Sequence, residues 1–313
     1  MAERRSWLLF SILCIGIAFL YLPILVLIAY SFNASPLVSV WGGFSTAWYG
    51  ELFRNQQILD AAGLSLEIGV AASTGATLLG TFAAVALVRF KRFPGRLLLT
   101  GMVNGPLIMP EIITGITQML LFVSMTALFA WPQSRGFSTI TIAHIAFCMG
   151  YVTVTVQSRL KSADRALEEA AMYLGAGPVR AFIDITLPII APALASGWLL
   201  SFTVSVDDLV ISQFVAGPGA STLPMVIYSK VKLGVSPDMN ALASLIIALV
   251  GGGVIAAGEL LLAPARAVVA ARTFPFFSEE LQILPARFGV EAGMIGAAAL
   301  AYDGLAELEA AAR

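Results

Sequence analysis

Five carboxylates lie within or beside long apolar runs, where a charged side chain is costly and therefore marks a candidate functional site. They are Glu67, Glu111, Asp207, Asp208 and Glu259. The adjacent pair Asp207 and Asp208 is the strongest candidate. Neighbouring residues of a helix point about 100° apart, so the two carboxylates cannot both face one direction. One carboxylate can line a cavity while the other bonds a neighbouring helix or subunit. The sequence leaves open whether the pair contacts a substrate or has a structural role, bonded to backbone amides or shaping a gate.

Two further features of the apolar runs have alternative interpretations. Glu111 follows Pro110 at a predicted helix break, so it either contacts the pathway or caps the helix that resumes there. Trp198 and Phe202 lie one helical turn apart and either form aromatic walls for a cationic chain or pack against core and lipid. The single histidine, His144, is expected to be a packed or hydrogen-bonded helix residue, and neither a metal site nor a catalytic set is predicted.

The composition indicates that much of the chain lies within a lipid membrane. Of 313 residues, 58% are hydrophobic and 12% are charged, and the mean hydropathy is +0.88. A soluble domain carries about a quarter charged residues. No basic stripe with interleaved aromatics is present, so nucleic-acid binding is not expected.

Apolar runs predict an all-α, polytopic membrane protein with about six transmembrane helices. The third run contains two prolines and is expected to bend or to begin with a short re-entrant segment. The sixth contains three consecutive glycines and is the weakest. The predicted spans are Trp7–Phe32, Leu64–Val88, Leu97–Ala130, Phe137–Val156, Pro188–Val215 and Ala241–Ala263.

The distribution of basic residues predicts the orientation. Fourteen of the 18 Lys and Arg residues fall on one side of these spans, and that side is assigned to the cytoplasm. Both termini are then cytoplasmic.

The segment 162–188, between the fourth and fifth spans, carries the most specific motif. Asp164 can cap a helix rich in helix formers, Gly175 suits a turn that needs positive φ, and Pro178 suits the first turn of a second helix. The motif combines Glu169-Ala170-Ala171 with Gly175, Ile185, Leu187 and Pro188 at fixed spacing.

This spacing resembles the EAA loop of ABC importer permeases. The resemblance implies a multi-pass protein of the bacterial inner membrane with the type I importer permease fold. It also implies a coupling helix that docks on a separate ATPase subunit. The implied coupling residues are Glu168, Glu169, Ala170, Ala171, Gly175, Ile185, Leu187 and Pro188. The chain has no phosphate-binding loop of its own, so it is expected to bind no cofactor, and ATP is used by the partner.

Further stretches resemble the polyamine branch of these permeases, with putrescine as the expected substrate. They are Tyr30-Ser-Phe-Asn33, Asn104-Gly-Pro-Leu-Ile-Met-Pro110, Ser205-Val-Asp207-Asp208 and Phe214-Val-Ala-Gly-Pro218. The resemblance implies a second permease, an ATPase dimer, a periplasmic polyamine-binding protein and membrane lipid as partners. Alternating access is the implied mechanism, with Asp207, Asp208, Glu111 and Trp198 as candidate pathway residues.

The chain is expected to divide into a membrane domain, residues 1–263, and a cytoplasmic tail, residues 264–313. From about Val250 onward the sequence resembles the C-terminal end of a ROK-family sugar kinase. The tail has none of that enzyme's phosphate-binding portion, so no enzymatic activity is expected. The alternatives are a secondary transporter or channel that works alone, which would show internal repeats, and a permease for another small solute.

Overall fold

A computed structural model describes residues 2–37, 40–90, 92–234 and 236–256. All regular structure in these residues is helical apart from an isolated bridge between Asn33 and Phe44, which agrees with the predicted all-α class. The elements are α1 (Ala2–Ser31), α2 (Ala47–Leu52), α3 (Gln56–Arg89), α4 (Arg96–Ile108), α5 (Glu111–Phe129), α6 (Phe137–Ser162), α7 (Ala166–Tyr173), α8 (Pro178–Ala181), a π-helical turn (Phe182–Thr186), α9 (Leu187–Asp207), α10 (Val210–Val215), α11 (Leu223–Leu233) and α12 (Pro237–Ala256).

Five segments of the described chain are long and apolar enough to cross a membrane. They are Ser11–Ser31, Gln56–Arg89, Glu111–Phe129, Phe137–Ser162 and Pro178–Asp207. The predicted sixth span corresponds to α12, which continues through the three glycines to Ala256. The rest of that predicted span, like Glu259 and the predicted tail, lies outside the described residues.

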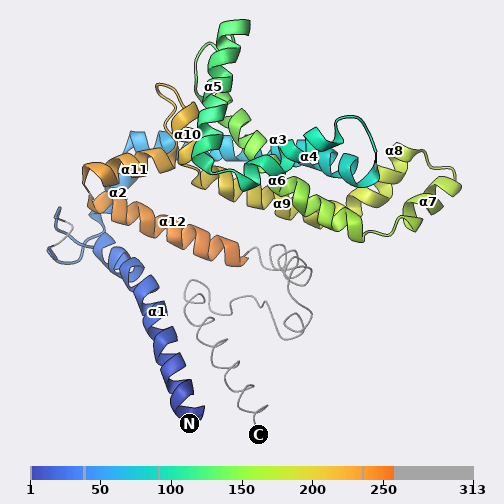
Figure 1. Ribbon diagram of the computed structural model, residues 1–313. Coiled ribbons are helices and arrows are strands. Elements are labelled where there is room, and N and C mark those ends of the chain that lie inside the picture. The colour runs from blue at the N-terminus through green and yellow to red at the C-terminus, as the bar shows by residue number, and fades with distance from the viewer. Residues whose placement is uncertain (1, 38–39, 91, 235, 257–313) are drawn as a thin grey trace. The chain divides into compact units, whose positions relative to one another are not determined.

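The predicted third span is two helices, as its prolines indicate. α4 ends at Ile108 and α5 begins at Glu111, with Pro110 between them in an extended conformation. Pro110 has no N–H to continue the helical ladder. Figure 1 shows that α5 runs at a steep angle to α4. At 13 residues, α4 is too short to span the hydrocarbon core, which needs about 20 residues.

The prediction of one continuous fifth span from Pro188 to Val215 is wrong. α9 ends at Asp207, the backbone is extended at Asp208, and a separate helix, α10, begins at Val210. The physical reason is local: the Asp208 side chain occupies the N–H groups of the first turn of α10, so the two helices do not join.

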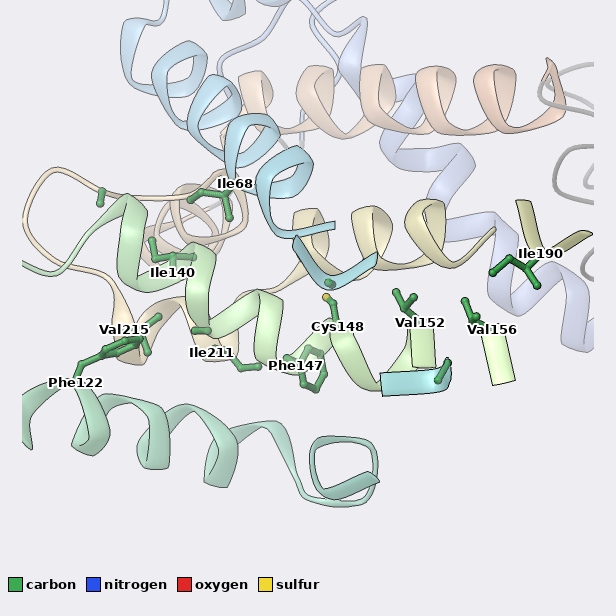
Figure 2. Packing of buried hydrophobic residues seen from close by; sticks show 14 of the residues in the cluster. Ile68, Phe122, Ile140, Phe147, Cys148, Val152, Val156, Ile190, Ile211 and Val215 are labelled. Atoms are coloured by element: carbon green, nitrogen blue, oxygen red, sulfur yellow. The ribbon is translucent and has the colours of Figure 1, made fainter. Parts of the chain in front are cut away.

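Contacts divide the described chain into two compact units, of which the larger contains residues 59–226. Its centre is α6, which packs against α4 on one side and α9 on another. Figure 2 shows the apolar cluster that α6 contributes to with Phe147, Val152 and Val156. Among the five candidate spans α6 has the largest buried share, 61% of its apolar window. It is the helix around which the larger unit is built.

Glycines let the helices of the larger unit approach closely. A Cβ added at Gly80 of α3 would lie 2.8 Å from the Val152 side chain, and one added at Gly150 of α6 would lie 2.6 Å from the carbonyl oxygen of Val103. Small residues at such crossings are typical of membrane helices, because association there depends on close packing.

The described residues within 2–58 and 227–256 form the smaller unit, with α12 packed against α1 and α2. Buried Asn33 organises the loop that follows α1. Its Oδ1 accepts the N–H of Gly42 at 2.7 Å, its Nδ2 donates to the carbonyl of Val40 at 2.7 Å, and its own carbonyl accepts the indole N–H of Trp48 at 2.6 Å. One side chain therefore closes the loop between α1 and α2.

The contact between α4 and α6 predicts a stability effect. Gly150→Ala places a methyl group against the backbone of α4 and should destabilise the fold by about 1–3 kcal/mol. The matched control is Gly101→Ala in α4, where an added Cβ meets no atom within 4 Å. We expect a lower melting temperature in detergent for the first variant only. Equal melting temperatures would show that the two helices do not approach as described.

Candidate functional site

The loop between α6 and α9 is a short helix held between two defined ends. The Asp164 carboxylate accepts the N–H of Ala166 at 2.9 Å in a turn just before α7. The N-cap residue is Arg165, which makes no side-chain capping bond, so Asp164 is not the N-cap that the sequence predicts. Pro178 stands in the first turn of α8, as predicted. A π-helical turn then joins α8 to α9, and such turns occur frequently at functional sites.

Gly175 ends α7 in the left-handed conformation that the sequence predicts. Its φ is +93°, its N–H donates to the carbonyl of Met172 at 3.0 Å, and the N–H of Ala176 donates to the carbonyl of Ala171 at 3.0 Å. These two bonds form a Schellman motif, which satisfies the last carbonyls of a helix. The glycine therefore fixes the direction in which the chain leaves α7.

The adjacent residues Glu168 and Glu169 lie in different environments. The half-buried Glu168 carboxylate forms an ion pair with Arg89 at the end of α3 and accepts the hydroxyl of Thr186 in the π-helical turn. Glu169 is exposed, and its carboxylate makes no interaction in the described part of the chain. Glu168 thus ties α7 to α3 and to the start of α9, whereas Glu169 is available to a partner.

An apolar surface accompanies Glu169 on this loop. The side chains of Tyr173 and Leu174 are 92% and 90% exposed, and Leu167, Met172 and Val179 are exposed beside them in the chain. Exposed apolar groups of this extent mark an interaction site. Of the other predicted coupling residues, Ala170, Gly175 and Pro188 are exposed, while Ala171, Ile185 and Leu187 are partly buried.

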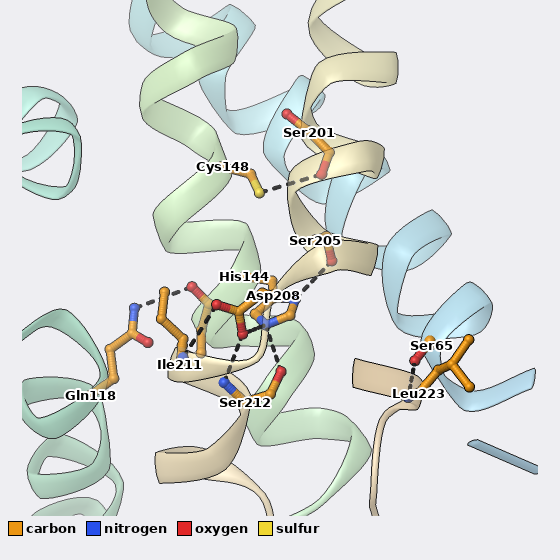
Figure 3. A network of polar contacts seen from close by, with 11 residues as sticks. Ser65, Gln118, His144, Cys148, Ser201, Ser205, Asp208, Ile211, Ser212 and Leu223 are labelled. Carbon is orange, nitrogen blue, oxygen red and sulfur yellow. Dashed lines mark hydrogen bonds and ion pairs between the residues drawn. The ribbon is translucent and has the colours of Figure 1, made fainter. Parts of the chain in front are cut away.

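The carboxylates of the predicted Asp pair lie in different environments. Asp207, the last residue of α9, is exposed and has no hydrogen bond or ion pair within the described residues. The Asp208 carboxylate is buried and accepts the N–H groups of Ile211 at 3.2 Å and Ser212 at 2.8 Å (Figure 3). The geometry therefore gives Asp208 the backbone-bonding role and leaves the Asp207 carboxylate without a partner among the described residues.

The buried carboxylate of Asp208 has a third partner on α6. His144 Nε2 lies 3.1 Å from Asp208 Oδ2 and 3.2 Å from Ser212 Oγ, and His144 Nδ1 lies 2.7 Å from Ser205 Oγ. The histidine is thus a hydrogen-bonded helix residue, as expected. Its contact with Asp208 was not predicted from the sequence. The available signal was that a carboxylate in an apolar run needs a polar partner from another run.

The remaining pathway candidates lie on α5 and α9. Glu111 is exposed in the first turn of α5 and makes no side-chain capping bond, although a carboxylate there is favoured by the helix dipole. Trp198 donates its indole N–H to the Thr74 hydroxyl at 3.1 Å and stacks on Phe202 with ring centroids 5.3 Å apart. The described residues contain no cluster of three or more His, Cys, Asp or Glu side chains able to hold a metal ion.

Comparison with known families defines the class of protein. Residues 76–263 match the family described as the binding-protein-dependent transport system inner membrane component. This chain belongs to that family, and it is therefore a multi-pass inner-membrane permease of an ABC transport system rather than an enzyme. The family match extends past residue 250, where the resemblance to permeases was expected to end.

Comparison with individual relatives identifies the branch of the family to which the chain belongs. The chain is 54% identical over 248 residues to the putrescine transport system permease protein PotI of Escherichia coli, an alignment that covers 79% of this chain and 88% of the relative. It is 44% identical over 232 residues to the spermidine/putrescine transport system permease protein PotC of the same species, covering 74% and 85%. The chain is thus a member of the polyamine permease branch.

Solved structures of low sequence identity share the fold. A chain of a bacterial ABC transporter involved in the import of the acidic polysaccharide alginate aligns with a TM-score of 0.63 at 16% identity, covering 88% of this chain and 98% of that one. The same kind of transporter in complex with its alginate-loaded periplasmic protein gives 0.56 at 17% identity, covering 88% and 96%. These likenesses establish the type I permease fold predicted from the sequence.

The turn after α7 predicts a graded response to substitution. Gly175→Ala forces a side chain into left-handed backbone and should destabilise the loop by about 1 kcal/mol. Gly175→Asn should lose less, because asparagine tolerates this conformation. Gly177→Ala is the matched control, since its φ is −67° and an added Cβ meets no atom within 4 Å.

The measurement is the protection of the loop against limited proteolysis in detergent. We expect it to fall for Gly175→Ala, less for Gly175→Asn, and not for Gly177→Ala. Equal protection in the alanine variants would contradict the assigned turn.

The unequal environments of the Asp pair predict unequal effects on stability. Asp208→Asn removes the charge that accepts two backbone N–H groups and faces His144, so unfolding should become easier by about 1.5–3 kcal/mol. Asp207→Asn, one residue away and exposed, should leave the melting temperature unchanged. Greater destabilisation by Asp207→Asn than by Asp208→Asn would reverse the assignment.

Proposed function

We propose that this chain is a permease subunit of an ATP-driven importer of polyamines, with putrescine as the main substrate. It forms half of the translocation pathway and couples to a separate ATPase through α7. The sequence identity supports the substrate class, because the chain is more similar to the putrescine permease than to the spermidine/putrescine permease, at 54% against 44%.

The observation that carries the coupling proposal is that α7 has an outward surface open to a partner and an inward side chain bonded to other helices. Glu169 and the apolar side chains of Tyr173 and Leu174 are presented outward, while Glu168 ties the same helix to Arg89 and Thr186. A helix with an outward docking surface and inward ties can pass a partner's displacement to α3 and α9. The sequence contains no phosphate-binding loop, so the source of ATP energy is a partner.

The unpartnered carboxylates support a cationic substrate. Asp207 and Glu111 are exposed in the described part of the chain and have no internal ion pair, which is unusual for carboxylates of membrane helices. A diammonium chain carries a positive charge at each end and an apolar middle. Carboxylates can attract its ends, and the stacked rings of Trp198 and Phe202 can contact a cation or its methylene groups.

The proposed cycle is alternating access. A periplasmic binding protein delivers the polyamine, ATP binding closes the ATPase dimer, and this closure displaces α7 and opens the pathway outward. Hydrolysis of ATP then resets the permease. The ion pair between Glu168 and Arg89 keeps the displaced helix attached to α3 throughout.

The proposal includes the remaining partners and the orientation. A second permease subunit completes the pathway, and both termini of this chain face the cytoplasm, as the basic residues predict. Residues 1–263 act as the membrane domain and residues 264–313 as a cytoplasmic tail without enzymatic activity. A stand-alone channel is the competing function, and only the importer requires an ATPase subunit in stoichiometric amount.

The decisive test is uptake of labelled polyamines by cells that lack their own second permease but supply the other three components. We expect putrescine uptake that depends on this chain and on ATP hydrolysis, with spermidine taken up more slowly. Co-purification in detergent should recover the ATPase subunit. Polyamine uptake that persists without the ATPase would favour the channel, and no polyamine uptake by the assembled complex would favour another solute.

A further inference from the structure

His144 makes three polar contacts that lie on both sides of the break between α9 and α10 (Figure 3). Ser205, in the last turn of α9, bonds to Nδ1 at 2.7 Å. Across the break, Asp208 and Ser212 lie 3.1 and 3.2 Å from Nε2. The imidazole is 1% exposed, so it is buried between the two helix ends. One buried side chain of α6 therefore sets the relative position of two helix ends.

This arrangement also fixes the direction of the neighbouring carboxylate. Asp207 and Asp208 are consecutive, so a displacement of Asp208 away from His144 would be passed through their shared peptide bond to Asp207, the last residue of α9. While Asp208 is held inward, Asp207 stays exposed and without a partner in the described residues. The position of the exposed carboxylate thus depends on a residue that does not touch it.

We propose that His144 is a positioning residue for transport, which holds Asp208 and Ser205 so that Asp207 faces the translocation pathway. This inference rests on the proposed function for the role of Asp207. The structural part of the claim, that His144 sets the exposure of Asp207, is independent of transport and can be measured separately.

The two ring nitrogens can be tested one at a time. His144→Phe keeps a ring of similar size and removes all three polar contacts. His144→Gln can place its amide near the position of Nε2 and retain the contact with Asp208. His144→Asn reaches only the position of Nδ1 and retains the contact with Ser205. If the tie to Asp208 is what positions Asp207, the glutamine variant should behave most like the parent.

The first readout is the reaction of Asp207→Cys with a cationic thiol reagent in the assembled transporter, in a background where Cys14→Ser and Cys148→Ser remove the native thiols. We expect His144→Phe to slow labelling about tenfold, the factor that corresponds to loss of one charged buried hydrogen bond, and His144→Gln to restore most of it. Thr203→Cys, on exposed α9 surface one turn earlier, is the matched control and should label equally in every background.

The second readout is putrescine uptake with Asp207 intact. We expect His144→Phe to reduce uptake about tenfold while the ATPase subunit still co-purifies, and His144→Gln to retain uptake. Equal labelling of Asp207→Cys in all His144 backgrounds would overturn the inference, and so would a matching change at Thr203→Cys. The predicted labelling pattern in a protein that transports no polyamine would refute the proposed function and leave the structural role of His144 intact.

Discussion

The larger unit of this permease depends on the hydrogen bonds that compensate the buried charge of Asp208. An isolated charge in an apolar interior is prohibitively unfavourable, so Asp208 requires donors on every accessible side. It obtains two from the first turn of α10 and faces His144 from α6. This requirement ends α9, starts α10, and binds both to the central helix. The exposed position of Asp207 follows from the same arrangement.

The loop between α6 and α9 meets a different requirement, because in the proposed coupling role α7 must be stiff at both ends. The turn bond from the Ala166 N–H to Asp164 and the Schellman motif at Gly175 supply that stiffness from local hydrogen bonds. Glu168 adds ties to Arg89 and to Thr186, so a displacement of α7 reaches two membrane helices. The apolar side chains that make α7 unfavourable in water are the ones that a partner would cover.

Local signals predicted much of the fold, and contacts between distant segments explain what was missed. Pro110 and Gly175 act through their own backbone, so the break before α5 and the turn after α7 follow from the sequence. The break at Asp208 was not predicted, because the continuous apolar run around it is typical of one helix. Its cause involves His144, 64 residues away, and no local pattern connects the two. The predicted roles in docking and transport concern surfaces that a single chain leaves uncovered.

The central claim is that the outward surface of α7 contacts an ATPase, and cross-linking tests it most directly. A photo-reactive amino acid at Tyr173, which is 92% exposed, should form a covalent adduct with the ATPase subunit in the assembled transporter. The same group at Phe129, exposed at the far end of α5, should form none. Absence of an adduct from Tyr173, or equal adducts from the two positions, would contradict the assignment of α7 as the coupling helix.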